Sequence, residues 1–367
     1  MRVLHINSAR TFNGGEQHFV DLCRGLTRRG HEIFVALRPT NKWQARLELP
    51  PENILHVSLR NSLGVLSATR IAEFIRERNI EIVHAHAPRD YIPASLACRI
   101  AKNAQFVLTH HVVFPMKPFH RLALNNLAVS IAVSEAVEAN LRRIFPPDKI
   151  AFVANGIDVA SRAGASREKL GQEFRFEHNI PFDALLVGIV GELKLLKGQR
   201  DFILAANIVA QKFPDARFVV VGKVGSARKD FRRELKRLVK IFRLEERFLW
   251  LDFVEDNSAL LAALDVFVSA SHTENFRLAI LEAMASGCAI VTTETRGARE
   301  TLDETMGKFV PVKEPVRLAE AIGEFLTDET MREDFGANAQ TKAKEKFDVG
   351  KMITEIEKVY QEILARK

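Results

Sequence analysis

The chain is short of the residues that would tie it together covalently or hold it in a membrane. Only three cysteines occur in its 367 residues, far apart and without a Cys-x-x-Cys pair, which argues against a disulfide framework or a zinc knuckle and for a reducing compartment. No apolar run approaches the ~18 residues of a membrane span, and the first residues lack the apolar core of a signal peptide. We therefore expect a soluble, cytoplasmic protein, and its length predicts two domains.

Aromatic residues other than phenylalanine are also scarce, and the positive charge is unevenly spread. With two tyrosines and two tryptophans the chain shows no aromatic-interleaved motif, so nucleic acid is not an expected partner. Ten basic and four acidic residues lie between Lys223 and Arg247, where apolar residues recur at helical spacing: Phe231, Leu235, Leu238 and Phe242. This pattern predicts an amphipathic helix. Its basic face is either simply solvated or attracted to an anionic surface, a membrane or a polyphosphate.

Short apolar runs alternate with helical stretches along most of the chain, a pattern typical of parallel sheets covered by helices on both faces. We predict strands at residues 3–6, 33–37, 54–59, 80–85, 106–109, 130–133 and 150–153, and again at 185–190, 217–221, 248–251, 266–270 and 289–292. The main helices are predicted at 16–28, 69–78, 134–144, 198–212, 230–243, 257–264 and 278–286, with helices alone after residue 315. The fold class is therefore α/β, with two Rossmann-like domains facing across a cleft in which the ligand is expected.

Changes in composition along the chain place the domain boundaries. Residues 1–158 are predicted to form the first domain, and the polar stretch 159–181, with its weak periodicity, is interpreted as an interdomain linker. Residues 182–346 are predicted to form the second domain. The terminal helix at 347–367 is expected to pack back toward the first domain.

A glycine pair follows the first predicted strand. Gly14, Gly15 and Glu16 open the first helix, where glycines let backbone amides approach an anion. A glycine pair is as often only a tight turn. The full G-x-G-x-x-G spacing is missing, which disfavours a dehydrogenase.

Histidines stand at two strand ends of the same domain. His84 and His86 follow one strand, and His110 and His111 follow another. A His-x-His pair on a strand shares one face, but no cysteine or carboxylate follows at ligand spacing, so we expect no metal site. One or two of these histidines are expected to line the cleft as hydrogen-bond donors, the others being structural.

The strongest pattern lies in the second domain, at residues 271–287. A strand ends, a short loop carries Glu274, and the following helix carries Glu282. Backbone amides at the positive end of that helix would stabilise a diphosphate, and the two carboxylates could accept hydrogen bonds from sugar hydroxyls. Alternatively, Glu274 complements the helix dipole and Glu282 faces solvent. After another strand, Gly191 and Lys197 precede a helix, and the lysine is suited to a phosphate.

Together these motifs resemble the retaining glycosyltransferases of family 4, the "group 1" nucleotide-sugar enzymes with the GT-B fold. The resemblance covers nearly the whole chain, and the Glu-x7-Glu element with the following Ala-Met-Ala is its most specific part. The matching elements are Gly14-Gly15-Glu16, His84-x-His86, Thr109-x-His111, Ser134-Glu135, Asn155-Gly156-Ile157-Asp158, Gly191, Lys197-Gly198, Glu274-x7-Glu282 and Glu300.

The resemblance implies a role for each matching residue. The second domain would hold a nucleotide-diphosphate sugar and the first domain the acceptor. The implied catalytic residues are His111 near the reacting sugar, Glu274 on the transferred sugar and Lys197 on the diphosphate. The implied donor-binding residues are Gly14, Gly15, Gly191, Lys197, Asn275, Phe276, Arg277, Leu278, Ala279 and, on the ribose, Glu282. Glu16, His84 and His86 would lie on the acceptor side, and the absence of an Asp-x-Asp sequence fits the family's metal-independent chemistry.

Two positions depart from the family's usual pattern. The family commonly has Arg where this chain has Glu192, and Gly or Pro where it has Arg277. Our hypothesis is that Arg277 supplies the cation that is missing at position 192. The alternative is that Arg277 points into solvent and Glu192 does unrelated work.

The sequence therefore predicts a retaining, metal-independent glycosyltransferase of cell-envelope polysaccharide or glycolipid synthesis, without a cofactor. The alternatives are a nucleotide-sugar epimerase or a sugar phosphorylase of the same fold, or a non-catalytic binder of sugar nucleotides or polyanions. The segment 112–127 mixes apolar and basic residues, which suits either peripheral contact with the inner face of a membrane or a helix packed on the first sheet. The motifs do not specify the donor base, the sugar, the acceptor or the oligomeric state.

Overall fold

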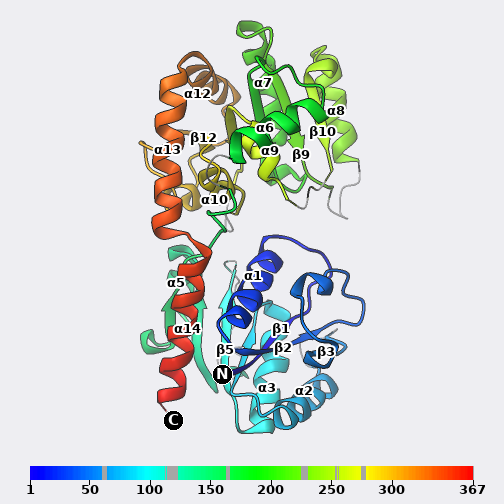
Figure 1. Ribbon diagram of the computed structural model, residues 1–367, viewed down its shortest axis with the longest axis vertical. Helices are drawn as coiled ribbons and strands as arrows, with labels where there is room; N and C mark the ends of the chain where they lie inside the picture. The colour runs from blue at the N-terminus through cyan, green and yellow to red at the C-terminus, as the bar shows by residue number, and fades with distance from the viewer. Residues whose placement is uncertain are drawn as a thin grey trace. The chain divides into compact units, whose positions relative to one another are not determined.

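The computed structural model describes residues 1–59, 64–111, 113, 123–162, 166–224, 230–252, 254, 256–273 and 278–366. The chain divides into two compact units (Figure 1). Unit 1 consists of Met1–Gly156 together with Val349–Lys367, and unit 2 of Ile157–Asp348. Each unit is built around its own parallel sheet, which confirms the predicted α/β class with two Rossmann-like domains.

The sheet of unit 1 has the strand order β3-β2-β1-β4-β5-β6-β7, and every pairing is parallel. Its strands are β1 (Arg2–Asn7), β2 (Glu32–Leu37), β3 (Ile54–His56), β4 (Ile82–Ala85), β5 (Gln105–His110), β6 (Leu127–Ala132) and β7 (Ile150–Phe152). Nearly all residues of the central strands are buried, because helices cover both faces, and this is why they read as continuous apolar runs. The strand expected at 54–59 is shorter, ending at His56.

Helices cover both faces of this sheet. They are α1 (Gly14–Arg28), α2 (Val65–Glu77), α3 (Tyr91–Ala101), α5 (Glu135–Leu141) and α14 (Val349–Ala365), with short 3-10 helices at Gln44–Leu47, Pro51–Asn53, Pro88–Asp90 and Pro147–Lys149. Leu4 and Ile6 of β1 share one core with α2 and α3. Val3 shares the opposite core with α1 and α14. The alternation of side chains along β1 therefore divides unit 1 into two buried layers.

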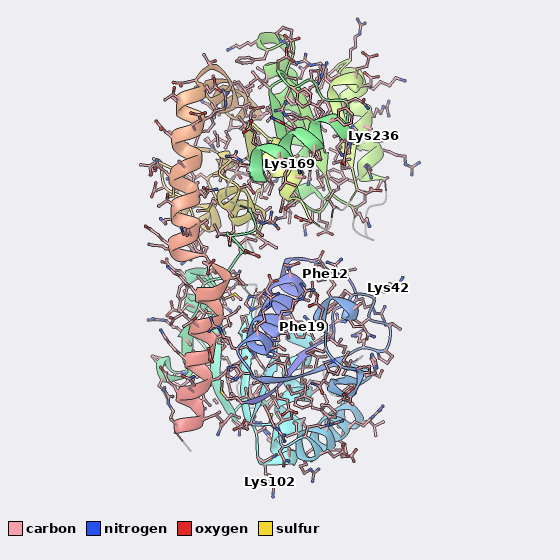
Figure 2. The ribbon with its side chains drawn as sticks, viewed as in Figure 1. Phe12, Phe19, Lys42, Lys102, Lys169 and Lys236 are labelled. Atoms are coloured by element: carbon pink, nitrogen blue, oxygen red, sulfur yellow. The ribbon has the colours of Figure 1, made fainter. Side chains whose placement is uncertain are left out.

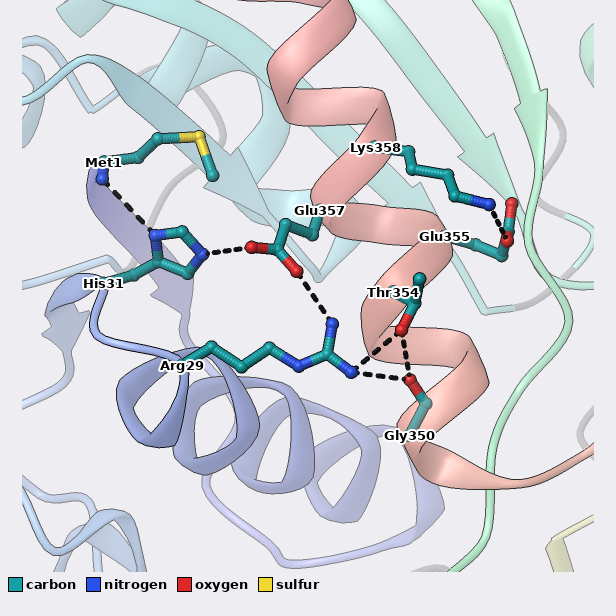
Figure 3. A network of polar contacts seen from close by, with 8 residues as sticks. All are labelled: Met1, Arg29, His31, Gly350, Thr354, Glu355, Glu357 and Lys358. Atoms are coloured by element: carbon teal, nitrogen blue, oxygen red, sulfur yellow. Dashed lines mark hydrogen bonds and ion pairs between the residues drawn. The ribbon is translucent and has the colours of Figure 1, made fainter.

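The last helix, α14, belongs to unit 1, where the sequence places it. It lies beside α1 (Figure 1) and buries Ile356 and Tyr360 completely. At the edge of this contact the Glu357 carboxylate takes a hydrogen bond of 2.7 Å from Arg29 and lies 2.7 Å from Nε2 of His31 (Figure 3). Exposed ion pairs contribute little, so the apolar contacts hold the helix in place.

Unit 2 repeats the same architecture, with the strand order β10-β9-β8-β11-β12-β13. Its strands are β8 (Leu186–Val190), β9 (Arg217–Val221), β10 (Phe248–Leu251), β11 (Val266–Ser269), β12 (Ala289–Thr293) and β13 (Gly307–Val310), all paired in parallel. The sequence analysis missed β13. Gly307 and Lys308 interrupt its apolar pattern, and the strand lies at the edge of the sheet, where burial is incomplete.

The helices of unit 2 are α6 (Ser166–Glu177), α7 (Gln199–Lys212), α8 (Phe231–Ile241), α9 (Ser258–Ala263), α10 (Leu278–Ala285), α11 (Arg296–Arg299), α12 (Pro315–Thr327) and α13 (Glu329–Lys346), with 3-10 helices at Leu195–Lys197 and Glu245–Arg247. The structure corrects the interpretation of 159–181 as a linker, because α6 lies in this stretch and packs against α9. Only a few apolar residues of α6, including the buried Phe174, face the core. The side chain of Arg175 is instead anchored by Asp265 at 2.9 Å, so the helical periodicity is weak.

The packing of α14 predicts how unit 1 responds to a buried truncation. Ile356→Ala removes three carbon atoms from a site with no exposed surface, so we expect a loss of about 2–5 kcal/mol in the free energy of unfolding. Ile241→Ala, at a helix position that is 64% exposed, serves as the matched control and should change stability by no more than about 0.5 kcal/mol. Urea denaturation measures both. Equal effects of the two substitutions would show that α14 does not dock through this face.

Candidate active site

The motifs of the sequence gather at the carboxyl ends of the central strands in each unit. The strand order reverses between β1 and β4 in unit 1 and between β8 and β11 in unit 2. In open parallel sheets, ligands bind outside the carboxyl ends of the strands at this reversal. The glycine pair follows β1 and His86 follows β4, while Gly191 follows β8 and residues 271–282 follow β11. In each unit, the predicted residues therefore lie at the position where this fold usually binds ligands.

In unit 2, the loop after β8 presents Lys197. Gly191 has a φ of +157°, and a Cβ atom there would lie 4.0 Å from Cδ of Lys197, so the lysine stem passes over this glycine. Gly198 has a φ of +68°, and a Cβ atom there would meet the Ala270 carbonyl oxygen. Only glycine fits at this close approach, which lets α7 begin directly after Lys197.

A backbone hydrogen bond links this loop to the end of β11. The amide of His272 donates to the carbonyl of Leu196 at 2.8 Å, and the His272 ring lies 2.7 Å from Asp201 of α7. The loop that carries Lys197 and the loop that leads to α10 are therefore held side by side. The sequence analysis did not single out His272 or Asp201.

Glu282 of α10 is fixed by two partners that the sequence analysis missed. Asn257 donates a hydrogen bond to its carboxylate at 2.8 Å, and a nitrogen of Arg162 lies 3.5 Å from the other oxygen. Arg162 also donates to the side-chain amide oxygen Oδ1 of Asn257 at 2.9 Å, which closes a three-residue network. This overturns the alternative that Glu282 faces solvent.

The environment of Glu282 balances two opposing effects on its charge. Burial raises the pKa of the Glu282 carboxyl, and the Arg162 guanidinium and the hydrogen bond from Asn257 act against this rise. The two partners also fix the direction of the carboxyl oxygens. Such a group suits the recognition of vicinal hydroxyls, which donate hydrogen bonds to it.

Four of the predicted residues lie outside the part of the chain that the structure describes: Glu274, Asn275, Phe276 and Arg277. Leu278 and Ala279 open α10, as the sequence predicts. The role of Arg277 as a replacement cation stays a prediction. Glu192 forms an ion pair with Lys194 at 2.7 Å, and each of the two side chains is about half exposed. The lysine therefore balances the charge of the Glu192 carboxylate. Most of the segment 112–127 also lies outside the described residues.

In unit 1, the glycine pair opens α1 next to His111. Asn13 precedes the helix, and its amide donates to the Glu16 carboxylate at 3.0 Å, so Glu16 caps α1. A Cβ atom on Gly15 would lie 3.9 Å from the His111 ring. Burial raises the pKa of Glu16 to about 7, which makes this cap sensitive to pH near neutrality.

The predicted histidines belong to a larger buried cluster. The rings of His84 and His86 lie 4.1 Å apart, as a His-x-His pair at the end of a strand requires. His84 is bonded on both nitrogens, to Tyr360 at 2.5 Å and to Thr109 at 2.7 Å. His86 instead contacts His5 of β1 at 3.0 Å between ring nitrogens.

A further histidine, His18 of α1, completes the cluster against His111, with ring centroids 4.7 Å apart. The sequence analysis did not single out His5 or His18, because a lone histidine in a strand or helix carries no motif. Burial lowers the pKa of His5 to about 3 and that of His18 to about 4, and holds the pKa of His84, His86 and His111 well below the usual value. At neutral pH these rings are uncharged, so each offers one donor and one acceptor.

Two Rossmann-like units of this topology are typical of the GT-B class of two-domain proteins, and sequence comparison identifies the family. Residues 171–342 match the family described as "Glycosyl transferases group 1", and residues 12–161 match "Glycosyltransferase Family 4". The chain belongs to this family of glycosyltransferases and is an enzyme of that class.

Individual relatives match over nearly the whole chain. The N-acetyl-alpha-D-glucosaminyl L-malate synthase of Bacillus anthracis is 27% identical over 373 residues, covering 94% of this chain and 92% of the relative. The phosphatidyl-myo-inositol mannosyltransferase of Mycolicibacterium smegmatis is 26% identical over 379 residues, covering 95% and 90%. Among solved structures, a glycosyltransferase from Rickettsia africae superposes with a TM-score of 0.87 at 22% identity, over 100% of this chain and 99% of that one. The HepE protein of Anabaena, solved with UDP and glucose, gives 0.83 at 22% identity over 98% of both.

Among the helices that the structure describes, none is both long enough and apolar enough to cross a lipid bilayer. Contact with a membrane surface is a separate question, which depends on the exposed faces of the helices.

The buried histidines predict that unit 1 loses stability in mild acid. Because the folded pKa of His5, His18 and His110 is lowered, the unfolded chain binds more protons below pH 6.5, and stability falls as the pH falls toward 4. Glu16 and Asp90 oppose this, since their folded pKa values are raised to about 7 and about 6. The histidines outnumber them, so we expect a loss of roughly 3 kcal/mol or more between pH 7 and pH 5.

Tryptophan fluorescence can follow this loss in unit 1 alone. Trp43 is buried in unit 1 and the other tryptophan, Trp250, is in unit 2, so urea denaturation in EDTA with a Trp250→Phe background reports on unit 1. Adding His110→Phe removes one buried ring that titrates and should make the fall shallower. A stability that stays level or rises toward pH 5 would contradict the prediction.

Proposed function

We propose that the protein is a retaining, metal-independent glycosyltransferase that moves a sugar from a nucleotide-diphosphate donor held by unit 2. The observation that carries this proposal is the network of Arg162, Asn257 and Glu282. It holds a partly buried carboxyl group in a fixed direction, beside a loop that presents Lys197 at the start of α7. Glu282 and Lys197 follow adjacent strands. A carboxylate suits the ribose hydroxyls of a sugar nucleotide, and a cation suits its diphosphate.

The proposed donor contacts follow from this geometry and from the family. Glu282 accepts hydrogen bonds from the ribose hydroxyls, and Lys197 with the amides at the start of α10 holds the diphosphate. The structural relative HepE was solved with UDP and with UDP-glucose, which supports a nucleoside diphosphate sugar as the donor class. Glu274 and His111 are proposed to contact the transferred sugar, and Gly14 and Gly15 the phosphates.

The proposed chemistry places the developing charge on the leaving diphosphate. Lys197 and the positive ends of α7 and α10 stabilise this charge as the glycosidic bond breaks, and such stabilisation lowers the barrier. The chain has no Asp-x-Asp sequence to bring a divalent metal to the phosphates. Retention is proposed to follow from attack on the same face of the sugar, with the leaving phosphate accepting the proton of the acceptor.

The proposed acceptor is a glycan or a lipid-linked molecule of cell-envelope synthesis. The names of the relatives support an anionic acceptor, since they include an N-acetyl-alpha-D-glucosaminyl L-malate synthase, a D-inositol 3-phosphate glycosyltransferase and a phosphatidyl-myo-inositol mannosyltransferase. Each of these acceptors carries a carboxylate or a phosphate. Glu16, His84 and His86 are proposed to lie on the acceptor side.

Two lysines of one loop test the proposed handling of the diphosphate. Lys197→Ala should lower kcat by about 100-fold to 1,000-fold, since one charge-stabilising donor in the transition state is lost. Lys194→Ala removes a lysine that pairs with Glu192 at the surface and should stay within about twofold of the parent. Transfer from UDP-, GDP- and ADP-sugars is assayed in EDTA, where full activity is expected.

Several outcomes would contradict the role of Lys197 or the proposed reaction. Equal losses from the two substitutions would mean that the lysine at position 197 has no special role. A strict requirement for a divalent metal would exclude the metal-independent account. Turnover of the donor without any acceptor would indicate an epimerase, and a requirement for inorganic phosphate would indicate a phosphorylase.

We also propose that the basic face of α8 contacts the anionic lipids on the inner face of the cell membrane. Phe231, Leu235 and Val239 of this helix are buried in unit 2. Most exposed charged positions of the helix are basic, at Arg233, Lys236, Arg237 and Lys240, with Glu234 the exposed acid and Arg243 following the helix. Lys236 can be seen on this helix in Figure 2. Ile241, 64% exposed beside them, adds an apolar contact. Such a face attracts anionic lipids by about 1 kcal/mol per cation near the surface.

Charge reversal on this face tests the membrane contact. Lys236→Glu with Lys240→Glu should reduce binding to vesicles of phosphatidylglycerol and phosphatidylcholine by at least about tenfold, because two cations near the lipid surface become anions. The control is Lys344→Glu with Lys346→Glu on α13, an equal change at exposed positions. Co-sedimentation measures both. Binding that survives the α8 substitution, or that does not weaken with added salt, would rule out this face as the contact.

A further inference from the structure

We propose that His18, His86 and His111 form a binding site for a divalent transition-metal ion of the zinc type. The three rings come from three separate elements of unit 1: α1, the end of β4 and the end of β5. One nitrogen of each ring lies within 4.8 Å of the others. This inference is separate from the handling of the diphosphate, for which we propose no metal, and it goes beyond the transfer reaction.

The packing of the rings supports convergence on one point. The centroids of His18 and His111 lie 4.7 Å apart, and each lies 6.1 Å from the centroid of His86. Zinc–nitrogen bonds of ~2.0–2.1 Å in a tetrahedral site need ligand nitrogens a few ångströms apart. The nitrogens of the trio, within 4.8 Å of one another, are close to that spacing.

Two of the three rings carry nitrogens that the rest of the described structure leaves without a hydrogen bond. Both nitrogens of His18 and Nδ1 of His86 are buried and have no partner among the described residues. Buried polar atoms in native proteins are normally satisfied, so an exception points to a ligand. His18 and His86 are only 4% and 3% exposed, which leaves little room for solvent to serve instead.

The remaining nitrogen of His86 is already held in place. Its Nε2 lies 3.0 Å from Nδ1 of His5, and a second contact of this kind fixes the ring and its tautomer in known metal sites. The tautomer that donates from Nε2 leaves a free lone pair on Nδ1, the nitrogen without a partner among the described residues. The neutral state of the rings is the state that a metal requires.

A second trio, formed by His5, His84 and His86, also has the right spacing. It is the weaker candidate, because both nitrogens of His84 are bonded to Tyr360 and Thr109. Binding there would break those bonds and the contact between His5 and His86. In the first trio, both nitrogens of His18 and Nδ1 of His86 make no such bond among the described residues.

The ligand set selects the type of ion. Imidazole suits zinc, copper, nickel and iron, whereas magnesium and calcium require oxygen ligands. Three neutral nitrogens leave a fourth position for water or an anion, as in open zinc sites. His111 is only partly buried, so the fourth position lies on the accessible side of the trio, where the start of α1 also favours an anion.

Direct metal binding tests this inference without relying on turnover. The full chain is stripped with EDTA, dialysed and titrated with Co²⁺, whose visible absorption is strong in a tetrahedral site. We expect one Co²⁺ per chain and displacement by Zn²⁺, which removes the absorption. Because His111 also belongs to the proposed transfer site, transfer is assayed separately in EDTA, so failure of one proposal does not decide the other.

Three variants decide whether the trio is the site. His18→Phe keeps the ring volume and should weaken binding by more than the ~10–100-fold caused by losing an outer partner. His110→Phe is the matched control, since His110 is equally buried but packs against Tyr91 instead of the trio, and it should bind Co²⁺ like the parent. If His18→Phe does not fold, His111→Asn at the partly buried position gives the same test. No absorption in the parent, or equal binding by all variants, would overturn the proposal.

Discussion

The cost of removing charge from water is the constraint on which the arrangement of both units depends. Parallel sheets bring the ends of their central strands together where helices exclude solvent, and a charged group there needs a partner or must become neutral. Unit 2 meets this requirement with partners, since Arg162 and Asn257 contact the carboxyl group of Glu282. Unit 1 meets it by neutrality, since its histidines are buried without charge. The two units therefore present different chemistry from the same topology.

Much of the fold could be predicted because buried parallel strands leave a strong pattern. The runs that became β8, β9 and β12 are continuous and apolar, and their predicted bounds differ from the observed ones by a residue at most. The pattern is weaker in a strand at the edge of the sheet, such as β13, because such a strand is less completely buried. It is also weaker where a polar side chain makes the contact with the core. Helix α6 is such a case, because Arg175 makes the contact that an aliphatic residue would normally make.

The site was only half predictable, for a related reason. Glu282 and Lys197 sit in local motifs, so a single stretch of sequence reveals them. Arg162 is 120 residues from Glu282 along the chain, and Asn257 is 25 residues away. No local pattern links such residues, and only the folding of unit 2 brings them together. The same holds for His5 and His18, which become notable only beside His86.

The division between a charged unit 2 and a neutral unit 1 has a consequence for how such enzymes diversify. In the proposed function a diphosphate makes the same electrostatic demand whatever sugar it carries, so the cation, the helix starts and the supported carboxyl group of unit 2 would not vary freely. A neutral cluster makes no such demand. A histidine without charge can donate to an anion, accept from a hydroxyl or bind a metal, and the choice depends on what its second nitrogen contacts. If unit 1 holds the acceptor, as we propose, contacts such as that between His5 and His86 would set which acceptor it takes. Substitutions around those second nitrogens would then be a route by which one scaffold takes different acceptors while its handling of the donor stays the same.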